Sequence, residues 1–508
     1  MALDIKTYPA EFKSHGSEKR AISAEIYGNR FHADQTLYEY LIEFLLVFVS
    51  EDLEGVNPKE KLSFHSPDAI GNLDYVVEPR IALKRFIFFD KNKKNDLTKI
   101  DQEAYSALIN ALKDKIEDAD DDVKMDIIEA LQDLLHGYAT VLKKRTWCAQ
   151  AMLPLCPELV FCEAMPKKRA RASLKWSDIY YSDDEQIKKK VDTEFDFDKR
   201  NFLARGGELY YLHILQGLQG KPDKKNTLEN LLREQLVVSG AQMSQIANFV
   251  QNTWEEHMGY EESPKQRLHM SFIPENAYKS IAADSVDELI SFLSCKMHPV
   301  KKIELLSKGV MIQIMRMLSV ATTNYLGQDR ECWIIDINGS NIVKKIASNS
   351  FSQVQGTFTT AIGKNMDAVD GAERLKLIAK AKKDSFDIFK SKGKELQCII
   401  PTSGPFERFS LPEDCLRFLV LALIEPQKKM TLDMFLNELY KKYRIVIGPN
   451  QYKMMIGEDI SDVALANSFN DNVVAFQEFL KATGFLRELS DATSIVINPY
   501  KYLEGEQE

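Results

Sequence analysis

The chain has 508 residues, which is enough for roughly three domains of about 100 to 200 residues, each with a buried core. Its hydrophobic share of 44% and charged share of 28% exclude a chain that is disordered throughout. The 66 basic and 75 acidic residues leave a net charge of −9, which excludes a protein coated with positive charge for wrapping nucleic acid.

The N-terminal part shows no pattern of export or membrane insertion. Residues 1–20 lack the apolar core of a secretory signal, so we expect them to belong to the mature protein. Residues 41–49 (LIEFLLVFV) are the most apolar run, but they are about half as long as a bilayer span and contain Glu43. We therefore expect a buried helix there and no membrane contact.

Cysteine usage points to a reducing compartment. Seven scattered cysteines do not form a secreted disulfide framework, and the spacing of Cys148, Cys156 and Cys162 fits no zinc site. We expect a cytoplasmic protein that holds no metal and no cofactor.

The first 150 residues mix helical and extended patterns. Residues 38–53 predict an apolar helix, and residues 73–89 (LDYVVEPRIALKRFIFF) have an extended pattern that Pro79 interrupts. Residues 101–139 predict two helices, because apolar residues recur there every three or four positions, with a solvated acidic corner at residues 120–122.

One short pattern in this region resembles the PD-ExK metal-dependent nucleases. Asp68 follows a proline, and Glu78 and Arg80 follow ten and twelve residues later. Two carboxylates and a cation can hold Mg²⁺ and activate a water molecule. Pro79 within the second element and arginine in place of lysine favour the simpler interpretation as loop carboxylates. Asp68, Glu78 and Arg80 remain weak catalytic candidates.

Residues 165–199 have the composition of a charged linker, because they carry basic, acidic and mixed runs and little apolar surface. A basic cluster followed by an aromatic ring can pair with phosphates and stack on an unpaired base, whereas a solvated linker is the simpler interpretation. The nucleic-acid-binding candidates in this segment are Lys167, Lys168, Arg169, Arg171, Lys175 and Trp176.

Residues 202–218 (FLARGGELYYLHILQGL) predict a helix that begins at two glycines. Gly206 and Gly207 leave the backbone amides open, and the start of a helix favours an anion there. Arg205 can add a bidentate contact to a phosphate or carboxylate. Glu208 in the first turn would satisfy the helix dipole itself and repel an incoming anion, which favours a self-capped start. Arg205, Gly206 and Gly207 are the anion-binding candidates.

The remainder of the chain up to residue 400 is mostly helical in pattern. Residues 202–326 are nearly pure helix, whereas residues 332–339 (CWIIDING) predict a short strand and a turn. Residues 351–365 (FSQVQGTFTTAIGKN) are rich in glycine and threonine and predict irregular structure. Residues 374–396 predict a helix that is basic on its exposed positions.

The last hundred residues predict a winged helix. Helical segments at residues 411–425, 430–445 and 471–484 are followed by two apolar runs around a polar corner at residues 485–500, which predict a β-hairpin. The third helix of a DNA-binding winged helix brings cations to the phosphates, but here it offers Lys481 beside Glu478. Docking to a protein is favoured. The candidates for a nucleic-acid contact in this region are Lys441, Lys442, Arg444, Lys481 and Arg487.

The fold class that follows is mainly α and multi-domain. We expect an N-terminal helical domain with some extended structure (1–164), the charged linker (165–199), a mostly helical central domain (200–400) and a winged-helix-like C-terminal domain (405–508).

Three segments together resemble parts of large bacterial proteins encoded in phage-defence islands: LKRFIFFDKNKK (83–94), FLARGGELYYLHIL (202–215) and GFLRELSDATSIVINPY (484–500). In those islands such proteins stand beside DNA methyltransferases, restriction components or ATPases. The resemblance implies a bacterial cytoplasmic protein that works inside a multi-protein system, and it supplies no catalytic residue.

The function expected from these observations is a non-enzymatic scaffold or adaptor of an anti-phage defence complex. No HExxH, GxSxG or CxxC signature and no P-loop spacing is present in the sequence. The expected partners are other proteins of the complex, such as an ATPase or a methyltransferase, and also DNA or a second copy of the chain. A DNA-binding or Mg²⁺-dependent nuclease subunit of the same kind of system is the alternative.

Overall fold

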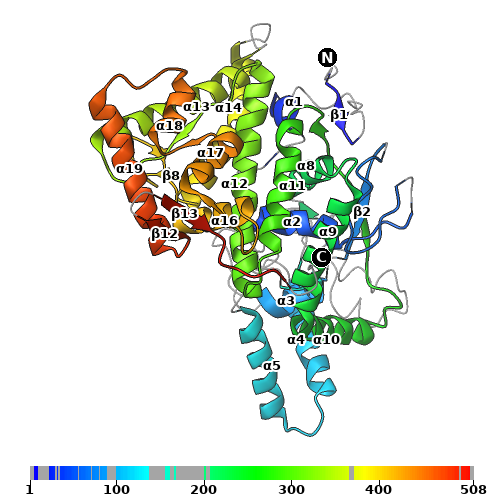
Figure 1. Ribbon diagram of the computed structural model, residues 1–508. Helices are drawn as coiled ribbons and strands as arrows, with labels where there is room; N and C mark the ends of the chain where they lie inside the picture. Colours follow the sequence, from blue (N-terminus) through cyan, green and yellow to red (C-terminus); the bar gives the residue numbers. More distant parts are fainter. Residues whose placement is uncertain are drawn as a thin grey trace.

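The described part of the chain is mainly helical, as the sequence predicts (Figure 1). The structure is a computed structural model. It describes residues 5–9, 22–28, 31, 35–54, 57–69, 71–78, 80–88, 99–136, 155–160, 165–166, 200–201, 206–364, 371–490 and 493–503.

Helix α2 (Leu37–Val49) lies in the middle of the N-terminal part. It begins with a capping box. The hydroxyl of Thr36 accepts a hydrogen bond from the backbone amide of Glu39, and the carboxylate of Glu39 accepts one from the backbone amide of Thr36. Almost every side chain of α2 is buried, including that of Glu43. The predicted buried helix is confirmed.

The N-terminal strands pair with residues far along the sequence. β1 (Thr7–Tyr8) pairs antiparallel with β6 (Ile273–Pro274), and β2 (Asp74–Val77) pairs antiparallel with β5 (Gln266–His269). Between β1 and α2 lies the short helix α1 (Ile22–Tyr27).

The second half of the predicted extended segment is helical, so that prediction was wrong. The strand β2 ends before Arg80, which has a positive φ of 48°, and α3 (Ile81–Phe88) follows. Leu83, Phe86 and Ile87 are buried in the core. A short apolar run cannot be assigned to a strand or a helix by periodicity alone, which explains the error.

Helices α4 (Lys99–Lys115) and α5 (Asp121–His136) form a hairpin that projects from the rest of the molecule (Figure 1). The carboxylate of Asp120 accepts the amide of Val123 at 2.9 Å and so caps α5. The predicted helices and their acidic corner are confirmed.

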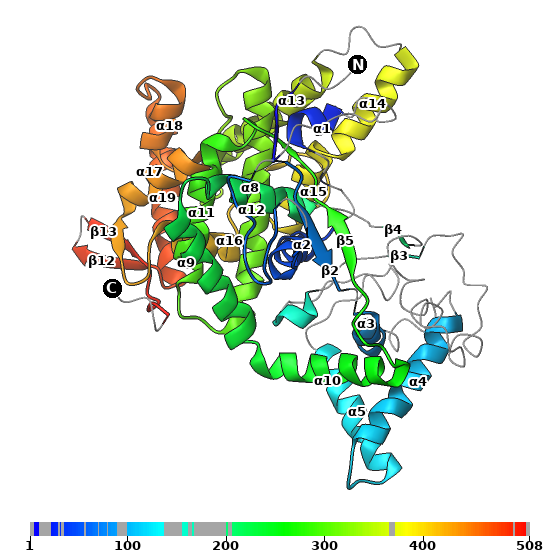
Figure 2. The same cartoon turned by 90° about the vertical axis from the view of Figure 1, so that its right-hand side faces the viewer.

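The long helix α12 (Pro299–Leu326) runs through the centre of the molecule (Figure 2). Among the described residues it is the one helix long and apolar enough to cross a membrane, but 94% of its apolar window is buried inside the protein.

Helix α8 (Gly206–Gly217) packs between α2 and α11 (Lys279–Leu293). The other elements up to this point are the 3₁₀ helix η2 (Pro157–Leu159), β3 (Met165–Pro166) paired with β4 (Arg200–Asn201), α9 (Pro222–Arg233), the π-helix η3 (Glu234–Val238) and α10 (Ala241–Met258).

Helix α13 (Asn341–Gly363) contradicts the irregular structure predicted for residues 351–365. Phe351, Val354 and Phe358 are buried at helical spacing, and the threonine hydroxyls bond to carbonyls of their own helix four residues earlier. Packing therefore overrides the weak helix propensity of glycine and threonine. Around it lie β7 (Trp333–Ile334), α14 (Gly371–Lys383), α15 (Phe386–Glu395), β8 (Ile399–Ile400) and β9 (Arg408–Phe409).

The C-terminal region contains the three predicted helices and the predicted hairpin. A three-stranded antiparallel sheet has the order β10-β13-β12, and β11 pairs in parallel with β7. In chain order the elements are α16 (Glu413–Leu423), β10 (Lys429–Thr431), α17 (Leu432–Tyr443), β11 (Ile445–Val446), α18 (Pro449–Ile456), α19 (Val463–Ala482), β12 (Leu486–Ser490) and β13 (Thr493–Ile497).

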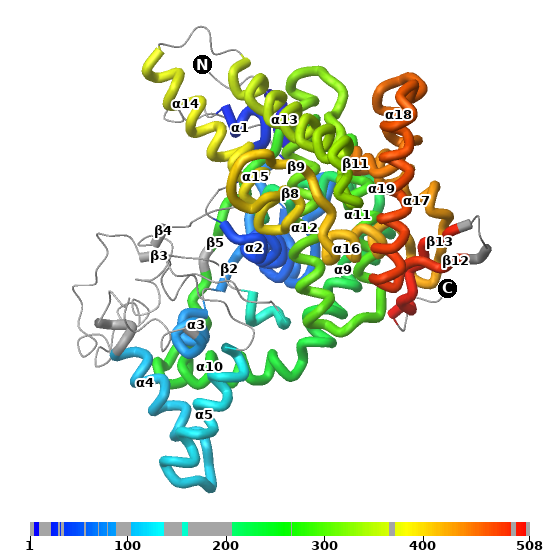
Figure 3. The backbone as a smooth tube through the Cα atoms, turned by 90° about the vertical axis from the view of Figure 1, so that its left-hand side faces the viewer, coloured from blue at the N-terminus to red at the C-terminus, as the bar shows by residue number. Residues whose placement is uncertain are grey.

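The buried apolar residues form one main cluster that extends from Tyr8 to Val496. Helix α16 packs against both α11 and α12, and α13 packs against α12 as well as α19 (Figure 3). Residues 331–400 therefore contact both the central helices and the C-terminal region.

Candidate functional site

The start of α8 donates to two acceptors, one on α2 and one two residues before α2. The amide of Gly207 donates to Oε2 of Glu43 at 2.8 Å, and the amide of Gly206 donates to Oε1 of Gln35 at 3.3 Å. The helix start thus binds a carboxyl group of the same chain. Glu208, in the first turn of α8, accepts hydrogen bonds from the hydroxyl of Tyr75 and the amide of Ser271. Arg205 lies outside the described residues.

Close contact between α2 and α8 explains the two glycines. A Cβ atom on Gly206 would lie 2.2 Å from Cε1 of Tyr40, and one on Gly207 would lie 2.2 Å from the carbonyl oxygen of Tyr40. No side chain fits at such distances, so glycine is required for the two helices to approach. The sequence showed the glycines, but it did not show that α2 would lie against them.

Glu43 is buried, so solvent does little to stabilise its charge. Burial raises the pKa of Glu43 well above its usual range, the carboxylates of Glu39 and Glu208 raise it further, and the amide of Gly207 opposes this rise. The neutral acid is therefore favoured in the folded chain.

This shift predicts a stability that depends on pH. Above the ordinary carboxyl pKa, the unfolded chain releases the Glu43 proton and the folded chain keeps it, so stability falls by up to about 1.4 kcal/mol per pH unit until the folded pKa is reached. Glu43→Gln mimics the neutral acid and is expected to remove this loss. The measurement is urea unfolding between about pH 4.5 and pH 8.

The exposed Glu54→Gln provides the control, because this carboxylate is largely in solvent. It is expected to leave the pH profile of the wild type unchanged. Parallel profiles for Glu43→Gln and the wild type would show that Glu43 does not titrate differently in the folded and unfolded chains.

Of the nuclease candidates, Glu78 and Arg80 follow β2 directly, whereas Asp68 lies in the segment before β2, next to Pro67, whose carbonyl accepts a hydrogen bond from the hydroxyl of Tyr8. The carboxylate of Glu78 binds Lys61 at 2.8 Å and Arg80 at 3.0 Å, and Arg80 also donates to the carbonyl of Pro157. Burial raises the pKa of Glu78, but the two cations outweigh it and hold the pKa below its usual range. Asp68 is exposed. In the described ranges, no three His, Cys, Asp or Glu side chains are grouped to hold a metal ion.

The cations proposed for nucleic acid in the C-terminal region mostly have partners in the protein. Lys441 binds Glu438 at 3.4 Å, Lys442 binds Asp284 at 3.4 Å, and Lys481 binds Glu488 at 3.3 Å. The guanidinium of Arg444 lies over the ring of Tyr440, and Arg487 is exposed. The basic cluster from Lys167 to Trp176 lies outside the described residues.

The outer face of α19 is apolar and acidic. Val463 is 71% exposed and Val474 is 56% exposed, and the carboxylates of Asp471 and Glu478 lie at exposed positions of the same helix. Met454 on the neighbouring α18 is also exposed. Exposed valines and carboxylates are poorly suited to a DNA backbone, which attracts cations.

The inner side of α19 is held in place by a buried asparagine. Asn472 accepts the amide of Ile337 at 2.8 Å and donates to the carbonyls of Ile335 and Ile447. It therefore joins the segments around β7 and β11 to α19 and leaves the opposite side of the helix facing outward.

A fully buried polar network joins the C-terminal region to the central helices. Arg316 on α12 binds both oxygens of Glu288 on α11, at 2.8 and 2.9 Å, and lies over the ring of Tyr443 on α17. The hydroxyl of Tyr443 donates to Glu288, as does the amide of Gln313. The ion pair is structural, because the described residues around it leave no opening to solvent at Arg316 or Glu288.

Two further groups with strongly shifted pKa values, Lys59 and His65, also belong to packed side chains. Burial lowers the pKa of Lys59 to about 7, and its amino group donates to the carbonyls of Phe48 and Ser50 at the end of α2 and to that of Glu60. Burial lowers the pKa of His65 to about 4, and both ring nitrogens have partners in the protein. Shifted pKa values often mark active sites, but these groups serve the fold.

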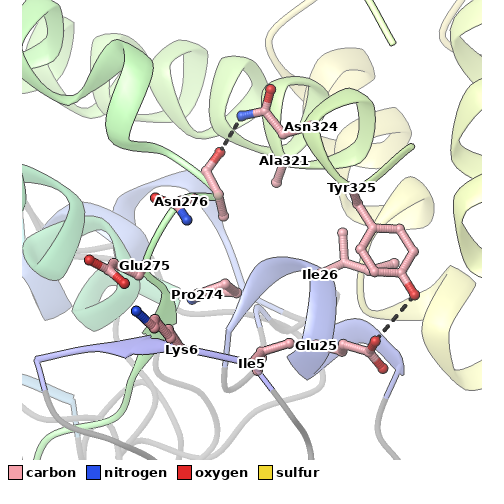
Figure 4. A pocket seen from close by; sticks show the side chains of 11 residues that line it. Ile5, Lys6, Glu25, Ile26, Pro274, Glu275, Asn276, Ala321, Asn324 and Tyr325 are labelled. Carbon is pink, nitrogen blue, oxygen red and sulfur yellow. Dashed lines mark hydrogen bonds between the residues drawn. The ribbon is translucent and has the colours of Figure 1, made fainter. Parts of the chain in front are cut away.

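A pocket of about 270 Å³ opens between α1, the end of α12 and the segment after β6 (Figure 4). Its buried wall contains Ile26 and Ala321, and at its edge the hydroxyl of Tyr325 donates to Glu25 at 3.3 Å. The volume is slightly below that of typical small-molecule sites. Its lining contains no serine, threonine, cysteine or histidine.

Comparisons with protein-family models, with curated proteins and with solved structures find no match to this chain. The functional argument therefore depends on the side chains described above.

Proposed function

We propose that this chain is a non-enzymatic scaffold or adaptor subunit of a bacterial anti-phage defence complex, and that it docks a partner protein through the outer face of α19. The observation that carries the docking proposal is the pair of exposed valines, Val463 and Val474, among carboxylates. The defence system is the context that the resemblance of the three sequence segments implies.

The order of elements in the C-terminal region supports a winged helix. Helix α16 precedes β10, α17 and α19 follow, and the hairpin β12–β13 closes the sheet in the order β10-β13-β12. In this interpretation α19 takes the place of the helix that enters the major groove in DNA-binding members of the class. Its side chains then decide which partner is bound.

The charges on α19 and on the segment before it favour a protein partner with a basic, apolar surface. Residues 458–478 contain five carboxylates and no lysine or arginine. Lys481, near the end of α19, is paired with Glu488. A phosphate backbone would meet repulsion at this face, whereas an interface with exposed apolar anchors and an acidic rim suits a complementary protein.

The test uses the tagged full-length chain expressed with the genes that surround it. Val463→Arg together with Val474→Arg is expected to reduce recovery of the neighbouring proteins about 30-fold or more, as expected for loss of an interface hot spot. Val123→Arg together with Val238→Arg, at exposed positions elsewhere, is the matched control and is expected to retain them. Hydrogen exchange of α19 should slow in the complex.

Two results would contradict the proposal. One is recovery of the wild-type chain alone from its native operon. The other is a complex that forms equally well with the α19 variant and the control variant, which would place the interface elsewhere on the chain.

A further inference from the structure

The outer face of α14 is a basic surface that the proposed docking face does not include. The helix carries Arg374 and four lysines against one carboxylate, Glu373. Lys376, Lys380 and Lys382 are exposed, and within the described residues none of these three forms an ion pair. The next helix differs, because all three lysines of α15 bind carboxylates: Lys390 and Lys394 bind Glu407, and Lys392 binds Glu395.

The opposite face of α14 holds the helix in place. Ala381 is buried, and Leu377 and Ile378 pack against the main core. The helix contacts α1, α13 and α15. In both side views α14 projects at the edge of the molecule opposite to α18 and α19 (Figures 2 and 3). The basic surface is therefore presented by a packed helix at a different place from the acidic face of α19.

The spacing of the lysines suits a polymer with closely spaced negative charges. Lys376 and Lys380 stand about one helical turn apart, about 6 Å along the axis and on the same side of the helix, whereas Lys382, two residues later, lies on the other flank of the exposed side. Duplex DNA carries one negative charge per about 1.7 Å of its axis, so several phosphates lie within reach of such a surface. The partner chemistry that best matches three lysines that have no ion pair within the described residues and lie on the exposed side of one helix is a phosphodiester backbone.

The neighbouring helix α13 is compatible with the same ligand. It contains no aspartate or glutamate, and its exposed positions include Ser352, Gln353 and Gln355. Such uncharged groups often bond to the phosphates and sugars of nucleic acids. Residues 365–370, between the two helices, contain Asp367 and Asp370, so the basic surface is confined to α14 itself.

We propose that the outer face of α14 binds the sugar-phosphate backbone of nucleic acid without reading its sequence. The net charge of −9 on the whole chain makes this contact local, and its affinity comes from release of counterions by a few lysines. The proposal is independent of protein docking at α19, since different residues on a different side of the molecule carry it.

The experiment measures binding of the full-length chain to labelled duplex DNA of about 30 base pairs between about 50 and 300 mM salt. The test variant carries Lys376→Gln, Lys380→Gln and Lys382→Gln. It is expected to reduce the slope of log K against log salt by about 2 to 3, because three phosphate contacts are lost at about 0.9 each. A scrambled duplex should bind the wild type equally well.

The matched control carries Lys279→Gln, Lys429→Gln and Lys501→Gln, which remove the same charge from exposed positions elsewhere. It is expected to keep the wild-type slope. An unchanged slope in the α14 variant, or no binding by the wild type at the lowest salt, overturns the proposal. So does tighter binding to vesicles of anionic lipid or to polyglutamate than to DNA, which would identify a different polyanion.

Discussion

Replacing Arg316 with alanine is expected to lower the free energy of unfolding by about 3 to 5 kcal/mol, because it leaves the carboxylate of Glu288 buried without its cation. Both side chains are completely buried in the wild type. Tyr443 and Gln313 still donate hydrogen bonds to Glu288 in the variant, but they bring no positive charge. Urea unfolding followed by tryptophan fluorescence measures the loss.

A double variant separates the charge effect from the packing effect. Arg316→Met combined with Glu288→Gln removes both charges and keeps most of the volume, so it is expected to recover a large part of the stability. Lys345→Ala, at an exposed position of α13, is the control and is expected to change stability by less than about 0.5 kcal/mol. If Arg316→Ala is as stable as this control, the network contributes nothing to the fold.

Gly207→Ala is expected to destabilise the chain by about 1 to 3 kcal/mol or more, because the new methyl group overpacks the contact between α2 and α8. The Cβ atom would lie 2.2 Å from the carbonyl oxygen of Tyr40 and 2.8 Å from the amide nitrogen of Phe44. These are backbone atoms, so one helix must move away from the other. The change in melting temperature is the measurement.

Gly356→Ala is the control for glycine replacement in general. Gly356 lies in α13, and a Cβ atom there would meet nothing within 4 Å. Alanine is expected to stabilise this helix by up to about 1 kcal/mol, because glycine costs more conformational entropy. The two variants should therefore shift the melting temperature in opposite directions. A shift of the same sign and size in both would mean that close approach is not what requires Gly207.

The elements that the sequence predicts well have strong local signals. The helices α16, α17 and α19 show apolar residues at helical spacing, and Thr431 caps α17 by accepting a hydrogen bond from the amide of Met434. The hairpin β12–β13 has two apolar runs around a polar corner. In each of these cases the residues that decide the structure are close together in the sequence.

The elements that the sequence does not predict depend on distant partners. The pairing of β7 with β11 is one case: β7 lies within the short strand predicted at residues 332–339, but β11 has two residues, too few for any periodicity, and lies more than a hundred residues later. Residues 351–363 look irregular in composition, but Phe351 and Phe358 bury their rings against Phe386 and make the segment helical. Tertiary contacts of this kind are not visible in local propensity.

For the polar sites too, the sequence shows the charged residues but not the distant partners that they bind. The sequence identifies Lys442 and Lys481 as cations, but it does not show that they meet Asp284 and Glu488. Glu43 is conspicuous as a carboxylate in an apolar run, and its partner Gly207 lies 164 residues later. A charged residue inside an apolar pattern was therefore a usable signal, although only the fold identifies what it binds.

The position of α2 within the core has a consequence for synthesis of the chain on the ribosome. This apolar helix is complete by Val49, but α12, which packs against it, ends at Leu326. At a translation rate of about 5 to 20 residues per second, the residues between Val49 and Leu326 take about 15 to 55 seconds to synthesise. Helix α2 cannot pack against α12 before then. During this interval the nascent chain exposes the apolar face of α2 that later packs against α12. We therefore expect the nascent chain to require a chaperone, and we expect fragments that stop before α12 to aggregate.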